Sequence, residues 1–193
     1  MLEREPVNII LADYVAGHIG QARLGAFRLG SSEFVTFVDD DDLFERGMFA
    51  AALAELQTHP DWAGVFFHEQ NIDARGNKTP SQSSRIPYSK TALAAMPGAF
   101  HHGLFRRWAV ERVLRCVADW PTYPEPVLFA NLAARHPMGK MAHGPSYLWR
   151  RHEQQATKTM RNAAELDEVT RHVTRLLFAQ KSPGCKTCGR GDK

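Results

Sequence analysis

The sequence predicts an α/β domain built on a mostly parallel sheet, and three observations lead to this fold class. Segments with strand patterns alternate with segments with helix patterns through the first half of the chain, as expected for strand–helix–strand units. Residues 34–38 form an almost continuous apolar run, which is typical of a strand covered on both faces. The chain has 193 residues, 44% of them hydrophobic, which is enough for one domain with a substantial core. We therefore expect one domain over residues 1–180, followed by a tail at 181–193.

Apolar periodicity and turn residues place the elements of the first half. Apolar residues at helical spacing indicate two helices, and Gly30 and Pro60 stand where these should end. The expected elements, in order, are a strand at 7–11, a helix at 17–29, the strand at 34–38, a helix around 49–56 and a strand at 63–67.

In the next part of the chain we expect a hairpin whose turn lies at residues 73–77. The polar segment 78–90 contains prolines and four serines, which indicates a surface loop long enough to act as a lid. The remaining expected elements are a strand at 99–105, a helix at 110–117, an irregular proline-rich stretch at 121–126, a helix at 127–135, an extended piece at 145–149 and a closing helix at 166–176.

Composition narrows the class of protein. No apolar run approaches the roughly 20 residues needed to cross a bilayer, and the charged N-terminus does not resemble a secretory signal. Three cysteines, two of them in the tail, do not make a disulfide framework. We therefore expect a cytoplasmic protein, and the mild net charge of +3 permits an anionic partner without requiring one.

Four consecutive carboxylates, Asp39 to Asp42, directly follow the apolar strand at 34–38. Adjacent negative charges at a strand end repel one another unless a cation lies among them. Ligands of α/β sheets bind at the carboxyl ends of strands, and hard divalent cations prefer oxygen ligands. The run therefore predicts either a cation site for a phosphate-bearing substrate or an acidic turn in which Asp42 caps the next helix.

Three stretches resemble family 2 glycosyltransferases, nucleotide-sugar-dependent enzymes of the GT-A fold. Gly20-Gln-Ala-Arg23 is similar to a shortened form of the family's Gly-x-x-x-Ala-Arg-Asn segment. Glu33-Phe-Val-Thr-Phe-Val-Asp-Asp-Asp-Asp42 resembles its Glu-Tyr-Ile-x-Phe-Leu-Asp-x-Asp-Asp segment. Tyr147-Leu-Trp-Arg-Arg-His152, with Thr157 beyond it, is similar to its Tyr-x-x-Arg-x-His…Ser ending. The resemblance covers about residues 7–160, and it implies a GT-A-like, Rossmann-like fold.

The resemblance also implies a cation site and a donor site. Asp39 and Asp41 match the Asp-x-Asp metal motif, where Mn²⁺ or Mg²⁺ would bridge the two phosphates of the donor, and His152 would complete the coordination. Asp42 would contact the metal ligands without binding the metal itself, or it would cap a helix. The residues implied in donor binding are Arg23, Asp39, Asp40, Arg150 and Arg151.

The general base of an inverting transfer is implied at Glu125, which lies where the family has a Glu-Asp pair. Pro126 occupies the place of the Asp, so Glu125 takes the role or Asp119 supplies it; alternatively, Glu125 is a helix-start residue favoured by the macrodipole. His101 and His102 are expected to line the acceptor side.

The chain departs from the family ahead of the acidic run. Family members carry further strand–helix units there that bind the base and ribose, whereas 38 residues precede Asp39, and Leu24 replaces the expected Asn. The nucleotide pocket is therefore expected to be reduced, or completed by another protomer or a partner protein.

The tail contains Cys185-Lys-Thr-Cys188, which resembles half of a zinc ribbon. Two chains sharing one Zn²⁺ is one interpretation, and a terminus whose thiols serve no role in the fold is the other. Basic residues beside the two cysteines suit a nucleic-acid contact.

The function that the sequence predicts is a metal-dependent inverting glycosyltransferase, which moves a sugar from a nucleotide-sugar donor to a hydroxyl acceptor. The acceptor is a glycan or a soluble acceptor such as protein or modified DNA. The alternatives are a GT-A-like module that binds without turnover and a nucleic-acid-binding protein that acts through its tail.

Overall fold

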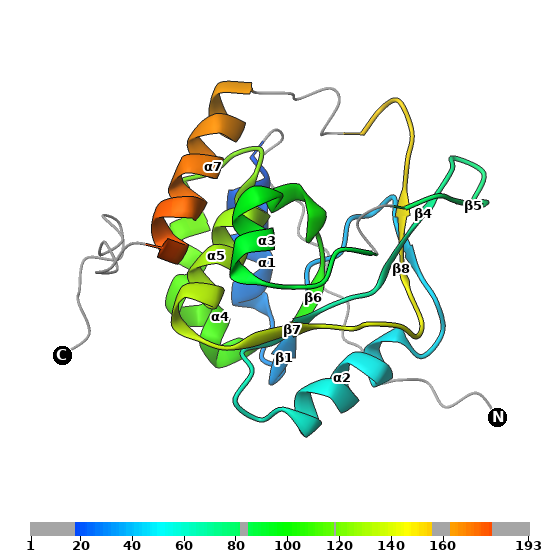
Figure 1. Cartoon of the computed structure of the whole chain (residues 1–193), viewed down its shortest axis with the longest axis horizontal. Helices are drawn as coiled ribbons and strands as arrows, with labels where there is room; N and C mark the ends of the chain where they lie inside the picture. The colour runs from blue at the N-terminus through cyan, green and yellow to red at the C-terminus, as the bar shows by residue number, and fades with distance from the viewer. Residues whose placement is uncertain (1–17, 82–84, 118, 156–162, 179–193) are drawn as a thin grey trace.

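The computed structural model describes residues 18–81, 85–117, 119–155 and 163–178 (Figure 1). Their helices are α1 (Ile19–Leu29), α2 (Met48–Thr58), α3 (Lys90–Ala95), α4 (Arg107–Val113), α5 (Pro124–Arg135) and α7 (Ala163–Phe178), with short 3-10 turns η2 (Pro97–Ala99) and η3 (Leu114–Val117). Their strands are β1 (Phe34–Val35), β2 (Leu43–Phe44), β3 (Gly64–Phe66), β4 (Glu69–Ile72), β5 (Lys78–Thr79), β6 (Gly103–Arg106), β7 (Met138–Lys140) and β8 (Tyr147–Arg150).

The first sheet has the strand order β1-β6-β3-β7, and the second has the order β2-β8-β4-β5. In the described residues β3 pairs with β7 and β4 with β8 in parallel, while the other four pairings are antiparallel. The α/β class is therefore confirmed, but the expectation of a mostly parallel sheet is wrong for these strands. The reason is that β6 runs antiparallel between β1 and β3, and a hairpin closes the second sheet.

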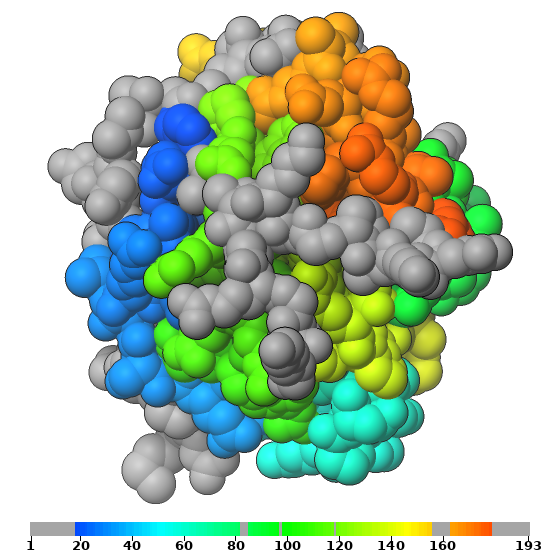
Figure 2. Space-filling model, turned by 90° about the vertical axis from the view of Figure 1, so that its left-hand side faces the viewer, coloured from blue at the N-terminus to red at the C-terminus, as the bar shows by residue number. Residues whose placement is uncertain are grey.

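The first sheet packs between two hydrophobic layers. Alternate residues of a strand face opposite sides of the sheet, so Phe66 and Phe105 join the cluster formed with α1, α3, α4 and α5. Val65 and Leu104 join the cluster formed with α2. Figure 2 shows the helical side from outside, with blue α1 on the left and orange α7 on the right. Helix α7 covers α5 and α3 through a third apolar cluster.

Several predicted elements are confirmed, and the boundaries of others are wrong. The helices expected at 17–29 and 49–56 are α1 and α2, and the hairpin around 73–77 joins β4 to β5. The strand expected at 34–38 is only the two-residue β1, which is half-buried because it pairs on one side, with β6. Helix α5 begins at Pro124 rather than at residue 127, since proline is accepted in the first helical turn.

Some predictions lie partly or wholly outside the described residues. These are the strand at 7–11 and the tail at 181–193, together with the middle of the loop at 78–90. No helix in the described part of the chain combines the length and the apolar character that a membrane span requires.

Helix α3, which follows the loop at 78–90, starts with a side-chain cap, and this cap gives a test of the local structure. Ser89 precedes α3, and its Oγ accepts a hydrogen bond from the backbone N–H of Ala92 at 3.0 Å. Losing such a cap costs about 1 kcal/mol. We expect Ser89→Ala to lower the free energy of unfolding by about that amount in urea denaturation. Ser31→Ala, in an exposed loop, is the control and should change it by less than about 0.5 kcal/mol.

Candidate active site

The acidic run forms a turn between β1 and β2, and its four carboxylates differ sharply in environment. Asp42 is buried, and it accepts hydrogen bonds from Tyr147 Oη and from the backbone N–H of Arg150, both at 2.7 Å. Both donors belong to β8, which pairs with β2 directly after the turn. Asp40 is exposed. Asp42 does not cap a helix, because the N-cap of α2 is Gly47, so this part of the sequence interpretation is wrong.

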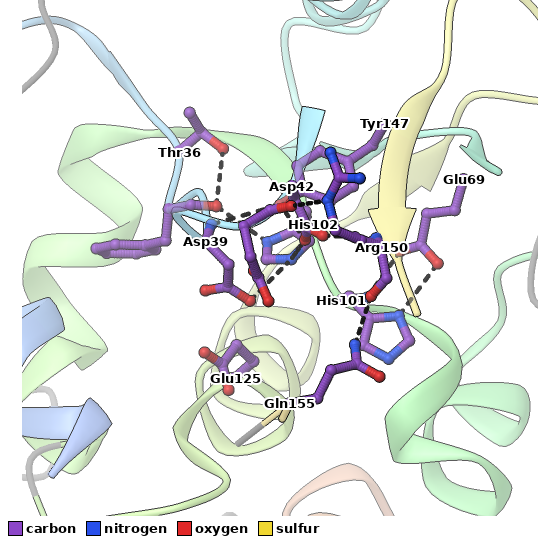
Figure 3. A network of polar contacts seen from close by, with 12 residues as sticks. Thr36, Asp39, Asp42, Glu69, His101, His102, Glu125, Tyr147, Arg150 and Gln155 are labelled. Carbon is purple, nitrogen blue, oxygen red and sulfur yellow. Dashed lines mark hydrogen bonds and ion pairs between the residues drawn. The ribbon is translucent and has the colours of Figure 1, made fainter. Parts of the chain in front are cut away.

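His102 enters the same pocket from the start of β6. Its ring is almost fully buried, and Nδ1 lies 3.0 Å from the carbonyl oxygen of Phe37. A carbonyl can only accept, so Nδ1 carries the hydrogen and Nε2 keeps its lone pair. Nε2 faces Asp39 Oδ2 at 3.6 Å and Asp42 Oδ2 at 3.9 Å (Figure 3). These distances are too long for hydrogen bonds.

The arrangement of Asp39, Asp42 and His102 fits a divalent cation. One ligand atom of each residue lies within 4.8 Å of the other two. Ligands on one ion with bonds of about 2.1 Å are separated by roughly 3 to 4 Å. Two carboxylates and an imidazole suit Mn²⁺, whereas Mg²⁺ prefers oxygen alone. The backbone carbonyl behind His102 is the kind of partner that orients a ligating imidazole.

The electrostatics of this pocket favour added positive charge. Burial raises the pKa of Asp42 to about 6, and the neighbouring Asp39 and Asp41 carboxylates push it in the same direction. Burial also lowers the pKa of His102, which disfavours the imidazolium form. A cation placed between the two carboxylates would stabilise their ionised forms.

Arg23 of α1 connects this pocket to α5. Its Nε donates to Glu125 Oε1 at 2.6 Å, and its Nη2 donates to Asp39 Oδ1 at 3.0 Å. Burial alone would raise the pKa of Asp39, but the charges of Arg23 and His102 and the hydrogen bond from Arg23 together lower it. The structure thus brings together three residues that the sequence singled out, with the guanidinium bound to two carboxylates.

Glu125 lies in the first turn of α5, which favours a negative charge there. The segment before α5 is fixed by the buried Glu165, whose Oε1 accepts the backbone N–H groups of Thr122 and Tyr123 at 2.9 and 3.1 Å. Asp119, the alternative base, is exposed. The general-base role of either carboxylate stays a prediction.

Asp41 and His152 contact each other directly, with Nε2 and Oδ2 2.7 Å apart. Their assignment as metal ligands stays a prediction, as does donor binding by Asp40. Arg150 Nε donates to the Asp41 carbonyl at 2.7 Å, and its Nη1 donates to the carbonyls of residues 73 and 74. Arg151 lies 4.1 Å from the centre of the Trp149 ring.

Glu69, which no sequence motif indicated, pairs with His101 at the edge of this site. Glu69 is fully buried and accepts from the backbone N–H of His101 at 3.0 Å and from His101 Nδ1 at 3.1 Å. Burial alone would raise the pKa of Glu69, but the His101 charge and hydrogen bonds bring it down to about 2. Glu69 lies between His68 and Gln70, outside the apolar run at 63–67, so its local sequence carried no signal of its burial.

The cysteines Cys185 and Cys188 lie outside the described residues. Zinc binding and nucleic-acid binding by the tail therefore stay predictions.

This chain resembles known proteins in its three-dimensional structure. No family model matches the sequence, and no curated protein does. The crystal structure of S. aureus TarS 1-349 in complex with UDP superimposes with a TM-score of 0.60 and 13% identity, covering 85% of this chain and 46% of that chain. The complex with UDP-GlcNAc has a TM-score of 0.60 and 12% identity, and the match covers 86% of this chain and 52% of that chain. The longer TarS structure has a TM-score of 0.62 and 13% identity, and the match covers 88% of this chain and 29% of that chain.

The chain has a GT-A-like fold. It spans about half the length of the TarS 1-349 structures it matches. The fold class that the resemblance implied is therefore confirmed, while membership of family 2 stays a prediction.

Proposed function

We propose that the chain is a metal-dependent glycosyltransferase that moves a sugar from a nucleotide-sugar donor to a hydroxyl acceptor with inversion. The observation that carries the proposal is the pocket of Asp39, Asp42 and His102, in a fold shared with TarS structures that contain UDP and UDP-GlcNAc. A divalent cation bound there would neutralise the charge that develops on the departing diphosphate. A UDP-sugar is accordingly the first donor to test.

The chain's own residues supply the rest of the reaction. The acceptor hydroxyl oxygen would form a bond to the anomeric carbon while the bond from that carbon to the diphosphate oxygen breaks. The electron pair of the broken bond would leave with the diphosphate, and the hydroxyl proton would pass to a carboxylate, for which Glu125 is the candidate. Arg23 would hold the Glu125 side chain in a fixed orientation, because it donates to that carboxylate.

Donor contacts would come from the segments that surround this pocket. Arg150 fixes the acidic turn through its own backbone N–H and its side chain, so it would act on the donor partly by holding Asp41 and Asp42 in place. We assign Asp40 and Arg151 to the donor side as well, because Asp40 lies in the acidic turn and Arg151 directly follows β8.

The proposal is tested by measuring thermal stabilisation with MnCl₂ and UDP together, and hydrolysis of a panel of nucleotide sugars. We expect the wild-type protein to be stabilised and to hydrolyse one donor slowly, and Asp39→Asn to lose both effects. Asp61→Asn, an exposed aspartate in the turn before β3, is the control for a lost negative charge. Stabilisation and hydrolysis that persist unchanged in Asp39→Asn would overturn the proposal.

A module that binds without turnover is the second candidate, and one observation favours it. The carboxylate of Glu125 is bound by Arg23, and the buried Pro126 occupies the position where the resemblance implies the family's base. This function predicts stabilisation by MnCl₂ and UDP in the wild-type protein, lost in Asp39→Asn, with no hydrolysis or transfer for any donor of the panel.

A further inference from the structure

A cavity lies at the outer edge of the first sheet, beside β7. Its volume is about 470 Å³, within the usual range for small-molecule sites. Three parts of the chain line it: Trp62, the segment 85–88 and the segment 138–142. Strand β7 is the last strand of its sheet among the described residues, so the cavity opens along a sheet edge rather than inside a core.

The polar side chains of this cavity carry one sign of charge. Arg85 and Lys140 contribute cations, and no carboxylate belongs to the described residues that line it. Lys140 Nζ donates to the carbonyl of Ile86 at 2.9 Å and lies 5.2 Å from the centre of the Phe100 ring. A cavity with two cations and no carboxylate favours an anionic ligand.

Tyr88 supplies part of the apolar wall of the cavity. The residue lines the cavity, and its ring packs against the rings of Phe66 and Phe100. Its hydroxyl oxygen has almost no accessible surface, so a ligand in the cavity would contact the ring and not the hydroxyl.

One wall of the cavity is held rigidly in place. The Trp62 ring stacks on His59 with centroids 3.8 Å apart and an interplanar angle of 9°. It also lies against the backbone of Gly139, where an added Cβ would come within 1.9 Å of the ring. The shape of the site is therefore preformed rather than dependent on a ligand.

Sheet register places the cavity near the candidate cation site. Lys140 pairs with Phe66, and Phe66 pairs with Gly103 on the other side. Lys140 and Gly103 are thus two strand spacings apart, about 10 Å, and His102 directly precedes Gly103. A ligand anchored at Lys140 and extended across the strand ends would reach the pocket of Asp39 and His102.

We propose that this cavity binds the acceptor substrate through an anionic group, a phosphate or a carboxylate. The inference rests on the proposed function and names its acceptor class. The anion lies between Arg85 and Lys140, and a hydroxyl at the far end of the ligand faces the reacting carbon.

The test measures binding of sorbitol 6-phosphate, gluconate and sorbitol to the full-length protein by calorimetry, without donor or metal. We expect both anions to bind, the better one identifying phosphate or carboxylate, and sorbitol to bind at least 10-fold more weakly. Lys140→Gln, which keeps a donor for the Ile86 carbonyl, and Ala142→Phe, which fills the cavity from an exposed position, should each weaken binding at least 10-fold. Lys90→Gln, an exposed lysine on α3, should bind like the wild-type protein.

Donor hydrolysis, measured on the same proteins, separates this inference from the proposed function. Hydrolysis retained in Lys140→Gln with anion binding lost supports the cavity assignment. Anion binding without any donor hydrolysis in the wild-type protein overturns the proposed function but not the site. Equal binding of sorbitol and the anions, or unchanged affinity in both cavity variants, overturns the site.

Discussion

His102→Gln is expected to weaken Mn²⁺ binding by about 100-fold or more and to remove metal-dependent donor hydrolysis. In the described part of the chain, the imidazole Nε2 of His102 is the nitrogen that lies opposite both Asp39 and Asp42 and could bind a metal with them. Removing a residue that hydrogen-bonds to a metal ligand already lowers metal affinity 10- to 100-fold, so removing a ligand itself should lower it further. Glutamine keeps a polar group in the buried space, which limits the loss of stability. Titration of the free Mn²⁺ signal by electron paramagnetic resonance measures the affinity directly.

His152→Gln is the matched comparison, because the family resemblance implies His152 as the nitrogen ligand, whereas the geometry favours His102. His152 Nε2 is hydrogen-bonded to Asp41, so replacing His152 should release the Asp41 side chain. We expect Mn²⁺ binding to weaken by less than about 10-fold, the smallest effect usual for a residue that only contacts a metal ligand. If His152→Gln loses Mn²⁺ and His102→Gln keeps it, the ligand set inferred from the motif is right. Circular dichroism spectra that match the wild-type spectrum would show that both variants are folded.

Local patterns predicted the helices well, because the apolar spacing of an amphipathic helix can be read from the residues of that helix alone. Helix α2 spans Met48–Thr58 where apolar spacing predicted 49–56. Strand β7 was missed because Met138–Lys140 has only three residues and no alternation. The direction of β6 was equally hidden, since an apolar run does not tell whether its neighbour runs parallel or antiparallel.

The same limit explains which part of the site could be predicted. Asp39 stood out because consecutive carboxylates after an apolar strand are unfavourable without a counter-charge. The partnership of Asp42 with His102 depends on β6 returning beside β1, a contact between positions 60 residues apart that no local spacing encodes. The motif favoured Asp41 by its two-residue interval, whereas the turn buries Asp42 and leaves Asp41 half-exposed.

Phe66→Ala is expected to lower the free energy of unfolding by about 3 to 5 kcal/mol, the usual cost of removing a fully buried phenylalanine. Phe66 is 1% exposed at the end of β3, and its ring contacts four aromatic rings, those of Tyr88, Phe100, Phe105 and Phe129. The cavity left behind is surrounded by rigid rings, so collapse around it should recover little of the lost packing.

Urea denaturation followed by tryptophan fluorescence measures this change, and Phe44→Ala is the control. Phe44 is 45% exposed and contacts the ring of Phe49, so its loss should cost about 1 kcal/mol or less. Phe66→Leu, which keeps most of the apolar volume, should fall between the two. A Phe66→Ala cost as small as that of Phe44→Ala would contradict the central position of this ring. Because Phe100 precedes His101 and His102 and Tyr88 lines the cavity, loosening of this aromatic cluster should weaken Mn²⁺ and anion binding together, at temperatures where the variant is still folded.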